Sequence, residues 1–365
     1  MKVLHLYKDY YPVVGGMENH IRILAEGAVK RGVEVTVLVT SRTNKTQVQE
    51  LNGVKLIKAG RITTVASTPL SFSLFRWVRR IGPDITHLHF PYPWGEMAHL
   101  LLGRSHRTVV TYQSDIVRQR TLLKLYRPFI GRVLARADRV IATSPQYIRT
   151  SPYLSQVADK CVVIPLAVDL EHFQRARREE VRRLRGKYGP PLLLFVGILR
   201  YYKGLEYLIR AMRHVNARLL VVGSGPMAEE WQHLTVKLGL ADKVFFVGQH
   251  VEDLPAYYQA CDLLVLPSSH RSEAFGMVQV EAMACGKPVI CTELGTGTSY
   301  VNVDGETGLV VPARDADALA QAINRLLTDK DLRREMGEKG RGRAMQEFSH
   351  EMMIDRVLAL YESLL

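Results

Sequence analysis

The chain lacks the features of secreted, disulfide-bonded or membrane-spanning proteins. Only four of its 365 residues are cysteine, and they form no close Cys-x-x-Cys pair. We therefore expect reduced thiols that fill the core of a cytoplasmic protein. No apolar run approaches the roughly 20 residues of a membrane span, and the opening residues 1–7 are too short and polar for a signal peptide. We expect a cytoplasmic protein, with any membrane contact peripheral and on the inner face of the cytoplasmic membrane.

Acidic residues are scarce in the first half of the chain. Residues 1–170 hold 24 Lys and Arg against 11 Asp and Glu, whereas residues 171–365 hold 25 of each kind. No helix-turn-helix spacing, zinc motif or aromatic RNA-binding signature accompanies this positive charge. We therefore expect no nucleic-acid partner.

Two stretches of the first half combine basic with apolar residues, which favours an anionic membrane surface as partner. In the alternative, the apolar side of each stretch packs on its own domain and the basic side is solvated. The stretches consist of Phe72, Arg76, Trp77, Arg79 and Arg80, and of Arg118, Arg120, Leu122, Leu123, Lys124, Leu125, Tyr126, Arg127, Phe129, Ile130, Arg132, Val133, Leu134, Arg136 and Arg139.

Length and strand pattern predict two α/β domains. The chain exceeds the size that one core usually supports, and short apolar strands alternate with helical stretches, as in doubly wound parallel sheets. Residues 170–189 are strongly charged and fit a linker with a solvated helix. The expected strands are 2–7, 34–39, 85–89, 108–111 and 140–143 in the first half, and 192–196, 219–222, 244–247, 263–266 and 288–291 in the second.

Two glutamates in a Glu-x7-Glu spacing are the most informative pair of residues. Glu273 lies in a Phe-Gly turn after the expected strand 262–267, at the end of the strand where open α/β sheets bind ligands. Glu281 lies about two turns down the helix that this turn opens. A phosphate or sugar at the start of that helix would meet both carboxylates. The alternative is a surface glutamate beside a buried one that is satisfied by hydrogen bonds.

Glycine turns follow two other expected strands. Gly15 and Gly16 precede a helical pattern over 17–31, so bare backbone and free amides can approach a phosphate there. Gly223 and Gly225 form a similar turn in the second half. Either turn is alternatively a plain strand-to-helix connection.

Two cations follow the turn at Gly197. Arg200 and Lys203 are placed to hold a leaving diphosphate as it accumulates charge, and positioned cations of this kind stabilise a transition state more than a ground state. The alternative for each is an exposed cation at the start of a helix.

In order along the chain, these motifs resemble the retaining, nucleotide-sugar-dependent glycosyltransferases with the GT-B fold, known as family 4. The matching landmarks cover nearly the whole chain. Smaller details at 200–205, 271–276 and 295–299 are most similar to bacterial O-antigen mannosyltransferases. The landmarks are residues 15–18, 165–169, 195–197 with 203–204, 223–226 and 273–281.

The resemblance implies two Rossmann-like domains that face each other across a cleft. Residues 1–169 would bind the acceptor, and residues 170–349 would bind the nucleotide sugar. A last helix over 350–365 would cross back onto the first domain. We identify no Asp-x-Asp pair that would hold a metal on the phosphates, and we expect neither a metal nor another cofactor.

The resemblance also implies roles for individual residues. Lys203 and Arg200 would stabilise the departing diphosphate, Glu273 would hold sugar hydroxyls, Glu281 would bind the ribose, and Glu18 would help to place the acceptor. The front-face mechanism of the family needs no enzyme nucleophile. The other donor-binding positions would be Gly15, Gly16, Gly197, Gly223, Gly225, Phe275, Gly276 and Met277.

Two positions depart from the family pattern. Ile198 stands where an arginine usually follows the glycine, and Gln113 stands where a histidine usually lies near the reactive face of the sugar. Glutamine can donate a hydrogen bond but cannot titrate, so activity survives only if that histidine orients donor oxygens. His87 and His89 are weaker candidates to replace it, because histidines at strand ends are usually structural.

The sequence thus predicts a glycosyltransferase, with mannose from GDP-mannose as the best guess for the donor. The acceptor would be a lipid-linked saccharide in cell-surface polysaccharide synthesis. One alternative is the same fold with a UDP-sugar donor. Another is a catalytically weak relative that binds a nucleotide sugar, favoured by Gln113 together with Ile198.

Overall fold

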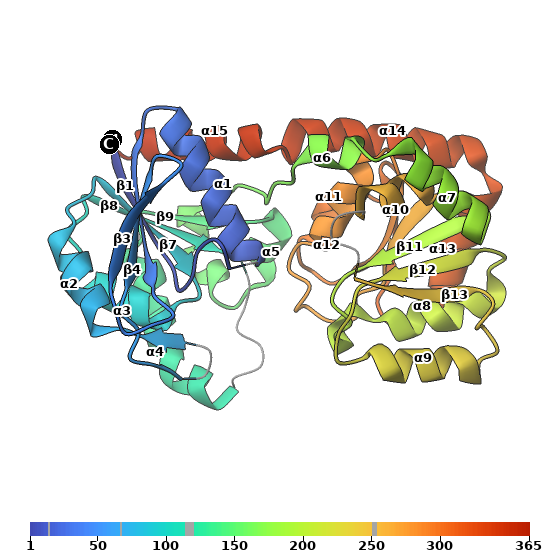
Figure 1. The fold of residues 1–365 in the computed structure, drawn as a ribbon, viewed down its shortest axis with the longest axis horizontal. Coiled ribbons are helices and arrows are strands. Elements are labelled where there is room, and N and C mark those ends of the chain that lie inside the picture. The colour runs from blue at the N-terminus through green and yellow to red at the C-terminus, as the bar shows by residue number, and fades with distance from the viewer. Residues whose placement is uncertain (14, 66–67, 114–119, 250–253) are drawn as a thin grey trace. The chain divides into compact units, whose positions relative to one another are not determined.

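The structure is a computed structural model that describes residues 1–13, 15–65, 68–113, 120–249 and 254–365. These form two compact units (Figure 1). Unit 1 comprises Met1–Leu166 with His350–Leu365, and unit 2 comprises Ala167–Ser349. The division lies three residues before the one expected after residue 169. The last helix of the chain belongs to unit 1.

Unit 1 is built on an eight-stranded sheet in the order β10-β9-β8-β7-β1-β2-β4-β3. Every neighbouring pair is parallel except β3 with β4. A separate antiparallel pair joins β5 to β6. The strands are β1 (Lys2–Leu6), β2 (Glu34–Thr40), β3 (Gln47–Leu51), β4 (Val54–Ala59), β5 (Thr63–Val65), β6 (Thr68–Leu70), β7 (Ile85–Phe90), β8 (Arg107–Tyr112), β9 (Arg139–Ala142) and β10 (Cys161–Val163).

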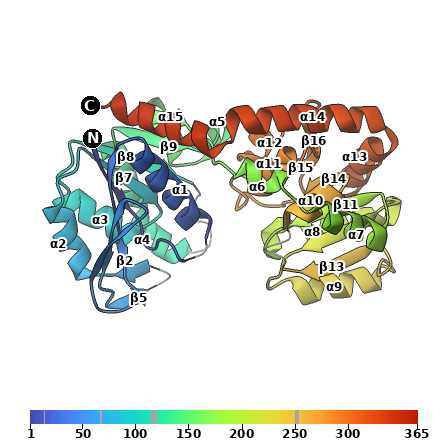
Figure 2. The same ribbon diagram turned by 45° about the horizontal axis from the view of Figure 1, so that its top comes forward.

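The helices of unit 1 pack on this sheet and on each other. Helix α1 contacts β2 and β4, and it also lies against α15 from the end of the chain (Figure 2). Gly27 of α1 permits this approach, because a Cβ there would lie 2.3 Å from Ile354 of α15. The helices are α1 (Gly16–Lys30), α2 (Phe72–Arg80), α3 (Pro93–Leu102), α4 (Arg120–Arg136), α5 (Pro145–Thr150), the 3-10 helix η1 (Leu154–Lys160) and α15 (His350–Glu362).

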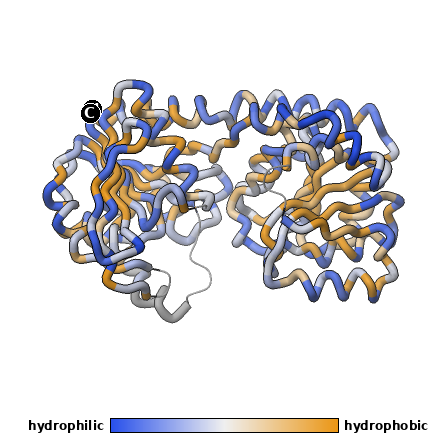
Figure 3. Tube along the Cα trace, viewed as in Figure 1, coloured by the Kyte–Doolittle hydropathy of each residue, from blue (hydrophilic) through white to orange (hydrophobic). Residues whose placement is uncertain are grey.

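Unit 2 contains a six-stranded, wholly parallel sheet in the order β13-β12-β11-β14-β15-β16. The central strands β11 and β14 are buried along their whole length. β11 appears as a continuous hydrophobic segment in Figure 3, and such burial is expected for strands covered on both faces. The strands are β11 (Leu192–Val196), β12 (Arg218–Val222), β13 (Val244–Gly248), β14 (Leu263–Leu266), β15 (Val289–Glu293) and β16 (Gly308–Pro312).

Helices of unit 2 connect these parallel strands, and others precede the first strand or follow the last. They include α6 and α7 in the charged segment that the sequence identifies as a linker with a solvated helix. The helices are α6 (Leu170–Gln174), α7 (Arg178–Tyr188), η2 (Tyr201–Lys203), α8 (Leu205–Ala211), η3 (Met212–His214), α9 (Ala228–Lys237), α10 (Leu254–Ala260), α11 (Met277–Ala284), α12 (Thr298–Val301), α13 (Ala316–Thr328) and α14 (Lys330–Glu347).

The predicted class, two doubly wound α/β domains, is confirmed. All ten expected strands are present to within two residues at either end. Strands β3, β4, β10 and β16, together with the β5–β6 pair, were not predicted. β3 is almost wholly exposed, and the apolar run of β16, residues 309–311, is only three residues long, so neither shows the run of about four or more apolar residues that marks a buried strand. Within the described residues, no helix combines the length and apolar character needed to cross a membrane.

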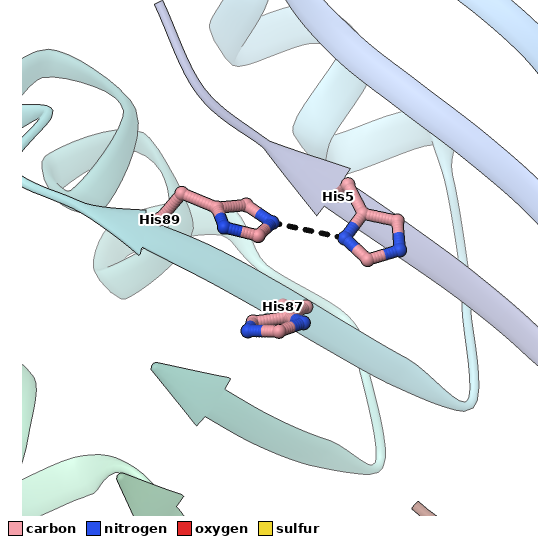
Figure 4. Close-up of side chains that lie close together, drawn as sticks. All are labelled: His5, His87 and His89. Atoms are coloured by element: carbon pink, nitrogen blue, oxygen red, sulfur yellow. Dashed lines mark hydrogen bonds between the residues drawn. The ribbon is translucent and has the colours of Figure 1, made fainter. Parts of the chain in front are cut away.

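A cluster of histidines lies in the core of unit 1. His5 on β1 and His87 and His89 on β7 are at most 1% exposed, and strand pairing places His5 beside His87. Figure 4 shows the hydrogen bond that joins His5 Nδ1 and His89 Nε2 at 3.0 Å. His87 is held by Thr111 Oγ1 and by the hydroxyl of Tyr361 on α15, each at 2.5 Å. The cluster therefore ties α15 to the sheet.

Three imidazoles this close together raise the question of a metal site. The rings of His87 and His89 are stacked, with centroids 4.3 Å apart and planes inclined by 26°. In stacked rings the in-plane lone pairs run side by side and do not converge on one point. Both nitrogens of His87 are also engaged, by Thr111 and Tyr361. We therefore interpret the cluster as a hydrogen-bonded core, and not as a substitute for the histidine that Gln113 replaces.

The histidine cluster predicts that unit 1 is acid-labile. Burial lowers the pKa of His5 to about 3 and that of the neighbouring His20 to about 4, and it holds the pKa values of His87 and His89 well below the ordinary value. The unfolded chain therefore binds more protons than the folded one below about pH 6.5. Stability should be complete above that pH and should fall below it, by up to about 1.4 kcal/mol per pH unit for each histidine.

Thermal melts between pH 7.5 and 4.5 measure this slope. The variant His89→Asn should melt with a shallower pH dependence, whatever its stability at neutral pH. His233→Asn, at an exposed position on α9, is the matched control and should keep the wild-type slope. Equal slopes in all three proteins would show that the cluster does not govern acid unfolding.

Candidate functional site

An ion pair joins two of the predicted site residues in unit 2. Lys203 Nζ lies 2.6 Å from Glu273 Oε2, and the same oxygen accepts a hydrogen bond from Ser268 Oγ at 3.0 Å. The side chains of Lys203 and Glu273 are only 11% and 10% exposed. Burial lowers the pKa of Lys203, but the charge of Glu273 and the hydrogen bond to it outweigh this and leave the pKa raised. The ammonium is thus kept charged at the edge of the sheet.

The pair lies at the carboxyl ends of three neighbouring strands. Lys203 follows β11, and Ser268 and Glu273 follow β14, which is the next strand in the sheet. The glycine turn after β12 closes against the turn after β11. At Gly223 the backbone has φ +143°, and a Cβ there would lie 2.0 Å from the carbonyl oxygen of Gly197. The glycines predicted to face phosphate therefore also let these turns pack together.

A second loop holds the backbone around Glu273. Thr296 Oγ1 donates to the Glu273 carbonyl at 2.7 Å, and the amide of Gly297 donates to Ala274 at 2.7 Å. The buried Gln279 donates to the carbonyl of Phe275 at 3.2 Å. These contacts fix the turn from which α11 begins.

Gly276 is the residue at which that turn becomes a helix. Its φ is +79°, a left-handed conformation that residues with a side chain rarely adopt. Met277 is then the first residue of α11. Glu281 is the fifth, so it lies slightly closer to the turn than the two helical turns that the sequence suggests.

Glu281 is half-buried and has a partner that the sequence does not predict. Tyr258 on α10 is fully buried and donates its hydroxyl to Glu281 Oε2 at 2.5 Å. Burial raises the pKa of Glu281, whereas the hydrogen bond from Tyr258 and the charge of Lys203 lower it, with a net rise. The charge of Lys203 therefore acts on both glutamates of the pair.

Arg200 is placed differently from Lys203. It is exposed, at the position that precedes the 3-10 helix η2, and its side chain makes no hydrogen bond or ion pair with any described residue. The nearby Ile198 is 54% exposed. The structure thus leaves Arg200 available to a ligand, and it leaves an apolar side chain in solvent where the family usually has an arginine.

The glycine turn of unit 1 meets the carboxylate of Glu18. Gly15 precedes α1 and Gly16 is its first residue. A Cβ at Gly15 would lie 2.1 Å from Glu18 Oε2, and Glu18 is only 8% exposed. The carboxylate is therefore folded back over the turn, at the end of the helix where negative charge is stabilised.

Gln113 follows β8 at the carboxyl edge of the sheet of unit 1. Its Nε2 is buried and has no hydrogen-bond partner within the described residues. A buried amide donor without a partner costs free energy, so a ligand oxygen there would gain from the contact. Arg118 and residues 114–117, which come next, lie outside the described residues.

Two Asp-x-Asp tripeptides begin at Asp315 and Asp329, and both are helix caps. Asp315 Oδ1 accepts from the amide of Ala318 at 2.9 Å, and Asp329 Oδ1 accepts from Leu332 at 2.8 Å. Side chains that cap the first turn of a helix satisfy its free amides. Neither tripeptide is joined to Lys203 or to the two glutamates by a contact in the described chain.

The structure thus brings most of the predicted residues of unit 2 to one edge of one sheet. Sequence reasoning missed Ser268, Tyr258, Gln279 and Thr296, which hold the predicted residues in place. Ser268 directly follows the expected strand, so its position at the carboxyl end of that strand could have been predicted from the sequence. Gln279 lies inside the Glu-x7-Glu run, but nothing in the sequence marked it. Tyr258 and Thr296 act through contacts between segments that lie apart in the chain.

Comparison with known proteins agrees with this geometry. The profile of the family described as Glycosyltransferase Family 4 matches residues 14–172, and that of Glycosyl transferases group 1 matches residues 177–343. The chain is 38% identical to O-antigen chain mannosyltransferase C of Escherichia coli, over 100% of this chain and 99% of that protein. It is 39% identical to D-rhamnosyltransferase WbpZ of Pseudomonas aeruginosa, over 96% and 92%.

Two solved structures have the same fold as this chain. Sucrose-phosphate synthase from Thermosynechococcus elongatus superimposes with a TM-score of 0.81 at 28% identity, covering 100% of this chain and 98% of that one. HepE of Anabaena, solved with UDP, gives a TM-score of 0.80 at 20% identity, over the full length of both chains. The chain therefore belongs to the glycosyl transferases of group 1 and family 4, and it is a glycosyltransferase with the GT-B fold.

Proposed function

We propose that the protein is a retaining glycosyltransferase of cell-surface polysaccharide synthesis that moves mannose from GDP-mannose to a lipid-linked saccharide. The observation that carries the proposal is the Lys203–Glu273 ion pair beside Glu281, at the carboxyl edge of the sheet of unit 2. Relatives named as an O-antigen mannosyltransferase and a D-rhamnosyltransferase support the pathway and the class of sugar. Unit 2 then binds the nucleotide sugar and unit 1 binds the acceptor.

In this proposal the diphosphate leaves against fixed positive charge. Lys203, held by Glu273, and the unpaired Arg200 stabilise the departing phosphates together with backbone amides at Gly276 and Met277. Fixed groups of this kind do not reorganise as charge develops. The cations take the role that a metal plays in other transferases, so the reaction needs no metal and no other cofactor.

The remaining residues orient the sugar and the acceptor. Glu273 accepts hydrogen bonds from sugar hydroxyls through the oxygen that Lys203 does not occupy, and Glu281 binds the ribose. Gln113 donates its free amide to a sugar oxygen, in the place of the usual histidine. Glu18 helps to orient the acceptor. The acceptor hydroxyl then attacks on the face from which the diphosphate leaves, and it passes its proton to the departing phosphate oxygen.

A pocket of unit 1 supports acceptor binding there. It has a volume of about 240 Å³ and lies beyond the ends of β1 and β2. Its wall includes the hydroxyls of Thr40, Ser41 and Thr43 and the carboxylate of Asp9, which Arg61 holds at 3.0 Å. Hydroxyls with a fixed carboxylate are suited to a saccharide.

A second candidate function is that of a catalytically weak sugar-nucleotide binder. The exposed Ile198 and the non-titrating Gln113 favour it, because each replaces a group that carries charge in the family. It predicts donor binding without transfer, so binding and turnover must be measured separately.

The donor prediction is tested by thermal stability against GDP-mannose, GDP-D-rhamnose and UDP-, ADP- and dTDP-sugars. A ligand at about 100 times its Kd adds about 2.7 kcal/mol to the folded state, which raises the melting temperature by a few degrees. We expect a selective rise with GDP-mannose that Glu281→Ala abolishes. The control variant Glu338→Ala, at an exposed position on α14, should still show the rise with GDP-mannose.

A selective rise in melting temperature with a UDP-sugar would show that the donor is a UDP-sugar and not GDP-mannose. Absence of any rise would contradict donor binding altogether. Binding without turnover would support the weak relative, and Gln113→His would then be expected to raise kcat.

The ion pair makes a prediction that separates stability from catalysis. Lys203→Met leaves Glu273 buried and unpaired, so it should cost about 3–5 kcal/mol of stability and lower kcat by about 10²–10³-fold. The double variant Lys203→Met with Glu273→Gln removes the unpaired charge. It should recover most of the stability and none of the activity, as measured by thermal melts and by sugar transfer.

The exposed pair of Lys339 and Glu335, at 2.6 Å with side chains 52% and 59% exposed, provides the control. Lys339→Met should change stability little, because exposed pairs contribute about 0–1 kcal/mol, and it should not change kcat. A double variant that retains wild-type activity would show that the Lys203–Glu273 pair is structural only.

We also propose that unit 1 contacts an anionic membrane surface. The apolar residues Leu74 and Val78 of α2 are buried in unit 1, whereas Phe72 is 65% exposed beside the exposed Arg76, Arg79 and Arg80. A groove of about 600 Å³ adds a second apolar surface with a basic rim. It is lined by Met97, Leu100, Leu101, Phe129, Arg132, Ala135 and Arg136 of α3 and α4.

The membrane prediction is tested by sedimentation with vesicles of phosphatidylglycerol and phosphatidylethanolamine. Binding should weaken as salt rises, and Arg79→Glu with Arg80→Glu should reduce it about tenfold or more, at about 1 kcal/mol per charge near the surface. Arg178→Glu with Arg182→Glu, on α7, makes the same change of charge in unit 2 and should bind as the wild type does. Salt-independent or absent binding would refute the membrane contact.

A further inference from the structure

Tyr258 fixes one oxygen of Glu281. Its hydroxyl donates to Glu281 Oε2 at 2.5 Å, and its ring packs edge-on against Phe173 of α6, with 5.4 Å between the ring centroids. The residue is fully buried on α10. A side chain that is held at both its ring and its hydroxyl constrains the rotation of the carboxylate it contacts.

The second oxygen of Glu281, Oε1, has no hydrogen-bond partner in the described part of the chain of the kind that Tyr258 provides for Oε2. Oε1 receives no hydrogen bond from any described residue, and Glu281 is only half-buried. The nearby ammonium of Lys203 is engaged by Glu273. A carboxylate offers about four acceptor positions, so Glu281 retains the capacity to accept two further hydrogen bonds in an orientation set by Tyr258.

We infer that Tyr258 is a positioning residue for nucleotide binding, which orients Glu281 so that its free lone pairs accept from the two adjacent hydroxyls of a ribose. The inference rests on the proposed function, in which Glu281 binds the ribose of the donor. Tyr258 itself does not touch the nucleotide. A vicinal diol is the ligand that matches two acceptor positions on one fixed carboxylate.

The hydroxyl of Tyr258 also keeps Glu281 in its accepting form. Burial raises the pKa of Glu281, and the hydrogen bond from Tyr258 and the charge of Lys203 lower it. Only the ionised carboxylate accepts from both hydroxyls at once, because a protonated one carries a donor on one oxygen. Removal of the tyrosine hydroxyl therefore loosens the carboxylate and raises the pH at which it becomes protonated.

Tyr258→Phe tests the inference, with GDP and UDP as probes in calorimetric titrations of the full-length protein. The Kd of the nucleotide that the wild type binds should rise about 10–150-fold, the range for one hydrogen bond to a charged group. The KM for the donor should rise with it, while kcat at saturating donor falls less than twofold. The 2′-deoxy nucleotide should bind wild type and variant with similar, weak affinity.

The pH profile of nucleotide binding is the second readout. Binding should weaken as the pH falls and Glu281 takes up a proton, and this midpoint should lie at higher pH in Tyr258→Phe than in the wild type. Tyr361→Phe is the matched control. It removes the hydroxyl of another fully buried tyrosine, which bonds to His87 in unit 1, and it should change neither the Kd nor the midpoint.

The outcomes separate this inference from the proposed function. An unchanged Kd and midpoint in Tyr258→Phe overturn the role of Tyr258, and if Glu281→Ala still loses binding the proposed function stands. A wild type that binds neither nucleotide refutes the proposed function instead. If Tyr258→Phe does not fold, Glu281→Gln replaces it, since an amide whose oxygen accepts from Tyr258 presents an NH2 donor, and no acceptor, to the ribose. An unchanged Kd in that variant overturns the inference as well.

Discussion

The ion pair between Lys203 and Glu273 is the constraint around which unit 2 is organised. Two charges with side chains about one-tenth exposed are stable only when each is paired and hydrogen-bonded, because their desolvation is costly. Ser268 supplies a further hydrogen bond to the carboxylate. The same requirement fixes the positions of the loops after β11 and β14, from which these residues come. A ligand that enters this edge therefore meets charges that are already in place.

The close packing of the turns follows from that constraint. Gly223 brings the turn after β12 against the carbonyl of Gly197, and Thr296 and Gly297 bind the backbone on either side of Glu273. None of these contacts involves a charge. They keep the turns rigid, so that a ligand does not have to order them. Preorganisation of this kind reduces the cost of binding and of charge development.

The histidine cluster in the core of unit 1 is held by hydrogen bonds between neutral groups and not by an ion pair. Its imidazoles are held neutral by burial and linked by hydrogen bonds to each other, to Thr111 and to Tyr361 of the last helix. The result joins the last helix to β7 through neutral groups. Unit 2 places a charged ion pair at the edge of its sheet, whereas the histidine cluster of unit 1 is held neutral.

The sequence alone determined the class of fold, the ten predicted strands and the residues that carry charge or bare backbone at strand ends. These are local properties, because hydrophobic periodicity and glycine turns depend only on residues that are close together in the sequence. The Glu-x7-Glu spacing likewise lies within one turn and one helix. The exposed strand β3 escaped prediction because it lacks an apolar pattern, and β16 did so because its apolar run is only three residues long.

Only the tertiary structure decided which partners those residues have. Lys203 and Glu273 are 70 residues apart, Tyr258 and Glu281 are 23 apart, and His87 and Tyr361 are 274 apart. Which strands become neighbours determines these contacts, and strand order is set by the packing of the whole domain. The sequence therefore supplied the candidate groups, and the fold decided whether each is paired, buried or free, because pairing depends on distance in space and not along the chain.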